Sequence, residues 1–102
     1  ILDRPNVQNL ATELEKEGIS VDDDMILLEV GNMLMEESKP EKALLLYKYY
    51  TESFPQIVVA WNDMGDVYLS LNNKGEAIKC YQQALKIRPE NPRAKASLEK
   101  LK

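Results

Sequence analysis

The fold is decided by residues 61–89, which read W-N-D-M-G-D-V-Y-L-S-L-N-N-K-G-E-A-I-K-C-Y-Q-Q-A-L-K-I-R-P. Apolar residues recur at helical spacing on both sides of a central polar turn. Gly65 and Ala77 are small enough for two antiparallel helices to approach closely, and Tyr81, one turn beyond Ala77, can reach into the gap. Pro89 stops the second helix. The stretch therefore predicts a hairpin of two antiparallel helices.

The same residue types occur once more in the chain, 34 residues earlier. The earlier copies are Gly31, Ala43, Tyr47 and Pro55. Because these are the small, aromatic and helix-stopping positions of the hairpin, the sequence predicts two copies of one structural unit.

The second copy resembles the tetratricopeptide repeat (TPR) family, whose signature is W-x₂-L-G-x₂-Y, then A-x₃-F, then P. The positions that carry the resemblance are Trp61, Met64, Gly65, Tyr68, Ala77, Tyr81, Ala84 and Pro89. The first copy departs further from the signature, with Leu27 for Trp61, Leu34 for Tyr68 and Tyr50 for Ala84. The resemblance implies an all-α fold, a right-handed α-α superhelix of antiparallel helical hairpins.

We expect four parts along the chain: an N-terminal helix and linker (1–23), repeat one (24–57), repeat two (58–91) and a C-terminal capping helix (92–102). Apolar spacing and caps predict helices at 5–17, 25–37, 40–54, 58–71, 74–88 and 92–101. Ser38 and Glu41 match a capping box for the third of these helices, and Asn73 is expected to cap the fifth.

An apolar patch distinguishes repeat one from repeat two. Leu45 and Tyr49 stand where the second repeat has Lys79 and Gln83. An exposed patch of this kind indicates that something covers it. We expect the N-terminal helix to do so through its apolar stripe, Val7, Leu10 and Leu14. The alternative is an upstream domain, since the chain starts at Ile1 and we expect it to be a piece of a longer protein or a processed one.

Composition argues against several classes of function. The 102 residues carry a net charge of -4, which disfavours nucleic acid as a partner, and no apolar run is long enough to predict a membrane span. There is no histidine, and Cys80 is the single cysteine, expected in the core. The run Asp22 to Asp24 lacks the ligand spacing of a calcium loop and is interpreted as a helix cap. We therefore expect no catalytic residue, cofactor or metal, and no enzyme.

The resemblance implies that the first helix of each repeat lines a concave groove that holds a peptide or a helix of a partner protein. By helical spacing, the predicted groove residues are Met25, Leu28, Asn32, Met35, Val59, Asn62, Asp66, Leu69 and Arg93. The methionines are equally compatible with a core position or with cover by the N-terminal helix. Of the positions with which some TPR domains grip a chaperone's terminal carboxylate, only Asn32 and Arg93 match, and Asp63 would repel that carboxylate. We expect no such binding.

Two other functions remain open at the level of sequence. The run 60–68 resembles the repeats appended to some bacterial serine esterases, which would make the chain a C-terminal accessory or dimerisation domain of a larger hydrolase. A third possibility is self-association as a homodimer through Leu45 and Tyr49. The compartment stays open between cytoplasm and periplasm.

Overall fold

The computed structural model describes residues 11–16, 18 and 24–101, and every regular element among them is a helix. After helical residues 11–16, the elements are α2 (Asp24–Glu36), α3 (Pro40–Ser53), α4 (Val58–Ser70), α5 (Lys74–Ile87) and α6 (Pro92–Lys100). The all-α prediction is confirmed. The predicted ends of α2 to α6 agree with the observed ones to about one residue, whereas Val7 and Leu10 lie outside the described residues. No helix in the described part of the chain is long and apolar enough to cross a membrane.

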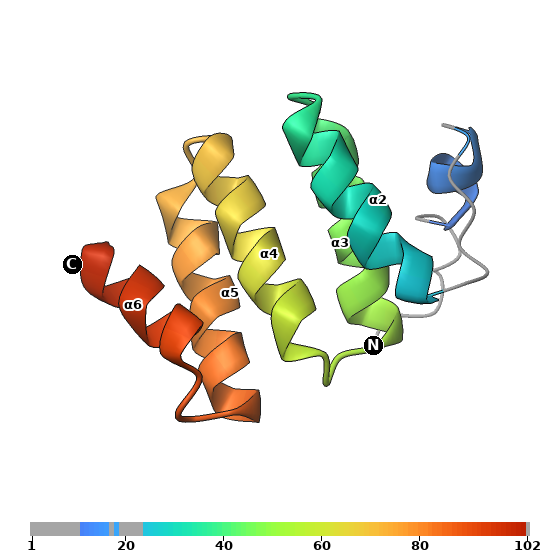
Figure 1. Ribbon diagram of the computed structural model, residues 1–102. Helices are drawn as coiled ribbons and strands as arrows, with labels where there is room; N and C mark the ends of the chain where they lie inside the picture. The colour runs from blue at the N-terminus through green and yellow to red at the C-terminus, as the bar shows by residue number, and fades with distance from the viewer. Residues whose placement is uncertain (1–10, 17, 19–23, 102) are drawn as a thin grey trace. The chain divides into compact units, whose positions relative to one another are not determined.

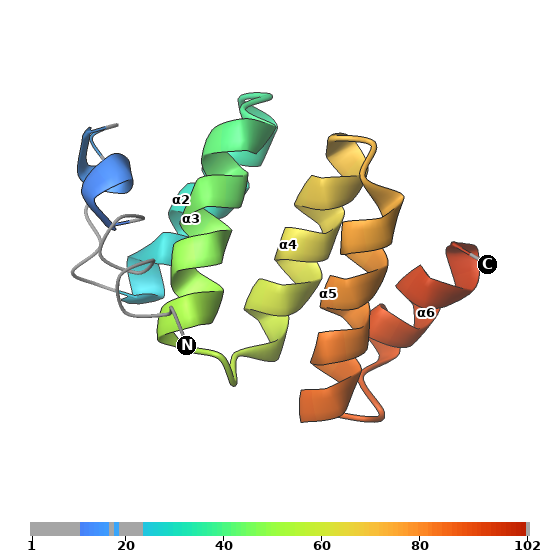
Figure 2. The ribbon, with the colours of Figure 1, turned by 180° about the vertical axis from the view of Figure 1, so that it is seen from behind.

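The chain forms two compact units, Ile1–Pro55 and Gln56–Lys102. The predicted division into four parts and the right-handed superhelix stay predictions. In the first unit, α2 and α3 run antiparallel side by side (Figures 1 and 2). Tyr47 fills the space between them, against Gly31, where any Cβ atom would overlap the tyrosine ring.

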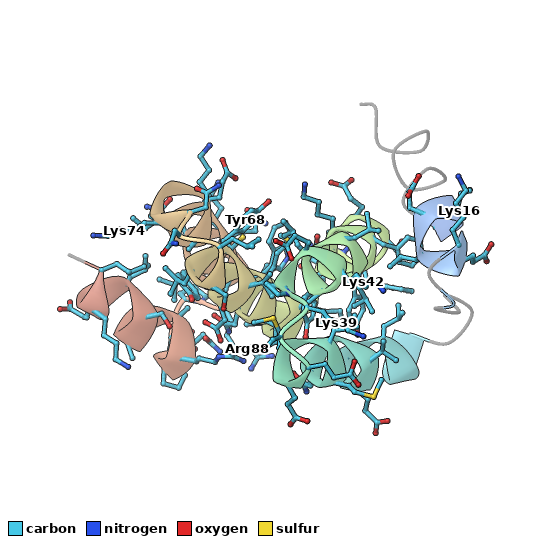
Figure 3. All side chains as sticks on the ribbon, turned by 90° about the horizontal axis from the view of Figure 1, so that it is seen from above. Lys16, Lys39, Lys42, Tyr68, Lys74 and Arg88 are labelled. Carbon is cyan, nitrogen blue, oxygen red and sulfur yellow. The ribbon has the colours of Figure 1, made fainter. Side chains whose placement is uncertain are left out.

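The short helical stretch 11–16 belongs to the first unit and buries one apolar side chain. Leu14 is fully buried, while Lys16, two residues on, is exposed and projects away from the ribbon (Figure 3). Leu45 and Tyr49 on α3 are half-buried. The contact predicted between this stretch and the Leu45–Tyr49 patch stays a prediction.

In the second unit, α4 and α5 form the equivalent hairpin and α6 packs against α5 (Figure 1). A Cβ atom on Gly65 would lie 2.7 Å from Cε1 of Tyr81, a ring that is fully buried. The core of this unit consists of Ala77, Tyr81, Ala84 and Ala94, packed by Val58, Trp61, Tyr68, Leu85, Leu98 and Leu101. The small residues on α5 therefore allow helices to approach it from both sides.

Both hairpins close with the same turn. Ser38 and Asn72 have φ of 61° and 60°, in the left-handed region, and each lies two residues beyond the end of its helix, α2 or α4. The amide N–H groups of Ser38 and Lys39 donate to carbonyl oxygens of the last turn of α2 at 3.0 and 2.8 Å. Those of Asn72 and Asn73 do the same on α4 at 3.0 and 2.8 Å. This is the Schellman pattern of helix termination, repeated at the 34-residue spacing of the sequence.

The turn explains one error in the sequence analysis. The predicted capping box at Ser38 is wrong, because Lys39 is the N-cap of α3 and makes no side-chain cap bond. Ser38 instead supplies the left-handed residue that ends the preceding helix. The cap predicted at Asn73 is confirmed, since its Oδ1 accepts the N–H of Glu76 at 3.2 Å.

Candidate partner-binding surface

Three of the four predicted groove residues on α2 have described side chains. Asn32 is exposed, and Leu28 and Met35 are half-buried. The side chain of Met25 lies outside the described residues. Sequence reasoning missed Met33, which is 49% exposed although its equivalent in the second unit, Val67, is 1% exposed. Apolar character alone did not distinguish the exposed methionine from the buried valine.

On α4, the predicted residues Val59, Asp66 and Leu69 form an exposed stripe, which we call the α4 surface. Val59 is 47% exposed and Leu69 is 37% exposed. The side chain of Asp66, between them in sequence, is 48% exposed. Their spacing of seven and three residues places them on one face of the helix. Two apolar side chains therefore flank an accessible carboxylate.

Asn62 lies on the same stripe but is 1% exposed. Its Nδ2 donates to Oδ1 of Asn91 at 3.1 Å, and that oxygen also accepts the N–H of Ala94 at 2.9 Å, which caps α6. Asn62 thus joins α4 to the start of α6 and belongs to the packing of its own unit. Its Oδ1 is buried and has no hydrogen-bond partner.

Arg93, in the first turn of α6, bridges two carboxylates of α4. Its Nη2 lies 2.7 Å from Oδ1 of Asp63 and 2.6 Å from Oδ2 of Asp66. The first turn is the unfavourable end of a helix dipole for a cation, and the two carboxylates offset that cost. The hydroxyl of Tyr81 on α5 donates to the other oxygen of Asp66 at 2.5 Å. Asp66 therefore connects all three helices of the unit.

Two members of this cluster, Tyr81 and Arg93, have raised pKa values. Burial raises the pKa of Tyr81, and so does its hydrogen bond to Asp66, so the phenol remains a donor. Burial alone would lower the pKa of Arg93. The hydrogen bonds to Asp63 and Asp66 and the negative charges of the two carboxylates together outweigh the effect of burial, so the pKa of Arg93 is raised above its ordinary value. The guanidinium stays charged.

Cys80 does not form a reactive site. Its thiol is buried, and burial raises its pKa to about 12, with a smaller contribution from Glu76. A thiol that stays protonated is a poor nucleophile and metal ligand. Within the described ranges, no group of three or more histidine, cysteine, aspartate or glutamate side chains could hold a metal ion.

The second unit is a helical-repeat hairpin, with a close glycine–tyrosine contact in its interior and an exposed face on its first helix. Residues 58–91 match the family model of the tetratricopeptide repeat, and they form such a repeat. The curated proteins give no match to the chain. A tetratricopeptide repeat indicates a protein–protein interaction module.

Proposed function

We propose that the protein binds a partner protein through the α4 surface and the equivalent face of α2. The observation that carries this proposal is the exposure of Val59 and Leu69, at 47% and 37%, on either side of the accessible Asp66 carboxylate. Contact with a partner removes these apolar side chains from water, which is favourable. The carboxylate adds a charged, directional contact between them.

The equivalent face of α2 has a similar make-up. At the 34-residue shift, Leu28, Asn32 and Met35 correspond to Asn62, Asp66 and Leu69. Exposed Asn32 can donate to and accept from a peptide backbone, and half-buried Met35 offers a flexible apolar contact. That the two faces form one concave groove stays a prediction, as does the inclusion of Met25, Asn62 and Arg93 among the contacting residues.

Peptides selected from a phage-displayed library, measured by fluorescence polarisation, test the proposal. We expect Val59→Asp and Leu69→Asp each to weaken binding about tenfold or more, because each places a charge in an apolar contact. Gln82→Asp, on an exposed position of α5, is the matched control and should leave the affinity unchanged. Circular dichroism establishes that all three variants are folded. Equal affinity in the three variants would contradict the assignment of the surface.

The proposal includes no enzymatic activity for this chain. We leave catalysis out because the repeat indicates a protein-binding role and because the Cys80 thiol is buried, with a raised pKa. An accessory role in a larger hydrolase stays a hypothesis, and so does homodimer formation through Leu45 and Tyr49.

A further inference from the structure

A further exposed face of α2 carries Glu29, Met33 and Glu36, which we call the α2 stripe. We infer that the α2 stripe is a second docking surface and that its partner is a basic amphipathic helix of another protein. The inference goes beyond the function proposed above and does not depend on it. The face in that proposal lies one position earlier, about 100° around the helix, at Leu28, Asn32 and Met35.

The α2 stripe lies on the side of α2 that points away from α3. Its members are spaced by four and three residues, so they share one face of the helix. The residues two positions before them are buried, and these are Leu27, Gly31 and Leu34. Gly31 meets the ring of Tyr47 on α3. Because two positions correspond to about 200° of rotation, the stripe lies almost opposite the packed face.

Met33 is the apolar centre of the stripe. Its side chain is 49% exposed, whereas Val67, at the equivalent position of the second unit, is 1% exposed. The same position of the repeat is therefore covered in one unit and open in the other. Contact with a partner removes Met33 from water, and its flexible, unbranched side chain adapts to the surface that it meets.

The charge around Met33 favours a cationic partner. Glu29 and Glu36 are exposed, and within the described part of the chain neither is paired with a cation. The sequence of α2 contains no basic residue, and Lys39, just beyond it, lies 3.1 Å from Glu37. Residues 1–55 contain twelve acidic and five basic residues, a net charge of -7. A basic segment is therefore attracted to the stripe, and an acidic one is repelled.

The spacing favours a helix as the partner. Glu29 and Glu36 are separated by seven residues, about 10.5 Å along α2. A helix alongside α2 has the same rise, so cations at its positions i and i+7 face the two carboxylates, and an apolar residue at i+3 or i+4 meets Met33. An extended segment spans the same distance in about three residues, and side chains three positions apart on a strand point to opposite faces.

Three synthetic peptides of about 18 residues, stapled so that they are helical, are titrated into isotope-labelled protein by NMR. The first has lysine at i and i+7 and leucine at i+3 and i+4. The second has glutamine in place of both lysines, and the third places the lysines at i and i+9, on opposite faces. We expect the first peptide to bind about three- to tenfold more tightly than the others and to shift the amides of α2 around Met33.

Two double variants with the same change in net charge separate docking on the stripe from general attraction to an acidic protein. Glu29→Gln with Glu36→Gln should remove the preference for the first peptide over the second. Glu41→Gln with Glu52→Gln, at exposed positions of α3, should keep it. Met33→Gln should weaken the first and second peptides alike, because both lose the apolar contact.

Equal binding of the three peptides would overturn the inference. An equal loss of preference in the two double variants, or shifts that miss the amides of α2, would do the same. Val59→Asp lies on the α4 surface and should leave the affinity of the first peptide unchanged. A loss in that variant would place the peptide on the α4 surface and would also overturn the inference. Failure of the α2 stripe leaves the function proposed for the α4 surface standing.

Discussion

At the scale of single residues, the two glycine–tyrosine contacts set how closely the helices of each hairpin approach. Tyr47 and Tyr81 are buried, and each ring occupies the volume that a Cβ atom would need at Gly31 or Gly65. A buried ring cannot move aside without disturbing its neighbours.

Gly65→Ala is therefore expected to lower the free energy of unfolding by about 1–3 kcal/mol, through overpacking against Tyr81. The matched control is Gly75→Ala on α5, where nothing lies within 4 Å of the added Cβ. That change should raise stability by about 0.5–1 kcal/mol, because alanine favours the helix more than glycine does. Urea unfolding measures both, and a loss of similar size in the two variants would contradict the hairpin geometry.

Ser38 is a second position where backbone conformation decides the effect of a substitution. Its φ of 61° is unfavourable for serine and favourable for glycine. We expect Ser38→Gly to stabilise the protein by about 1 kcal/mol, as measured by urea unfolding. Asn72→Gly should gain less, because asparagine tolerates the left-handed region better. Destabilisation by Ser38→Gly would show that the residue does not adopt this turn.

At the scale of helices, the side chain of Asn91 has two roles. Its Oδ1 caps α6 and also accepts the amide of buried Asn62. Asn91→Ala should cost about 2–3 kcal/mol, because the cap is lost and a buried donor is left without a partner. Asn73→Ala, which removes only a cap, should cost about 1 kcal/mol. Thermal unfolding measures both variants. If Asn91→Ala and Asn73→Ala lose the same unfolding free energy, the hydrogen bond between Asn62 and Asn91 contributes nothing to stability.

The helices themselves could be predicted from the sequence, because residues such as Pro92 and Asn73 mark their ends chemically. The turn at Ser38 could not, since serine fits both an N-cap and, less well, a left-handed position. The burial of Asn62 depends on Asn91, 29 residues away, and no local pattern signals such a pair. Helical spacing was enough to place Val59, Asp66 and Leu69 on one face of α4. It could not predict that Tyr81 and Arg93 donate hydrogen bonds to Asp66.

At the scale of the whole molecule, the free energy of unfolding should fall at alkaline pH, because the Cys80 thiol and the Tyr81 phenol are buried in their protonated forms. The pKa of Cys80 is raised from 9.0 to about 12 in the folded protein. Above pH 9 the unfolded chain loses the thiol proton while the folded protein keeps it, so ionisation favours unfolding. This contribution to stability is fully present below that pH and falls as the pH rises. Tyr81 adds to the fall above its ordinary value of 10.0.

We therefore expect the melting temperature to decline progressively from pH 8 to pH 10.5, with a shallower decline in Cys80→Ala. The quantity to compare is the slope of melting temperature against pH, because removing the Cys80 side chain also lowers the stability at pH 8. Identical slopes for the two proteins would show that the thiol ionises equally well when folded.

We propose that this protein binds its partner through the exposed face of α4, in a tetratricopeptide repeat. NMR chemical-shift mapping with a peptide selected for binding tests this proposal most directly. We expect the largest shifts on the amides of α4 between Val59 and Leu69, with smaller ones at Arg93. Shifts centred on the exposed positions of α5, at Lys79 and Gln82, would contradict it.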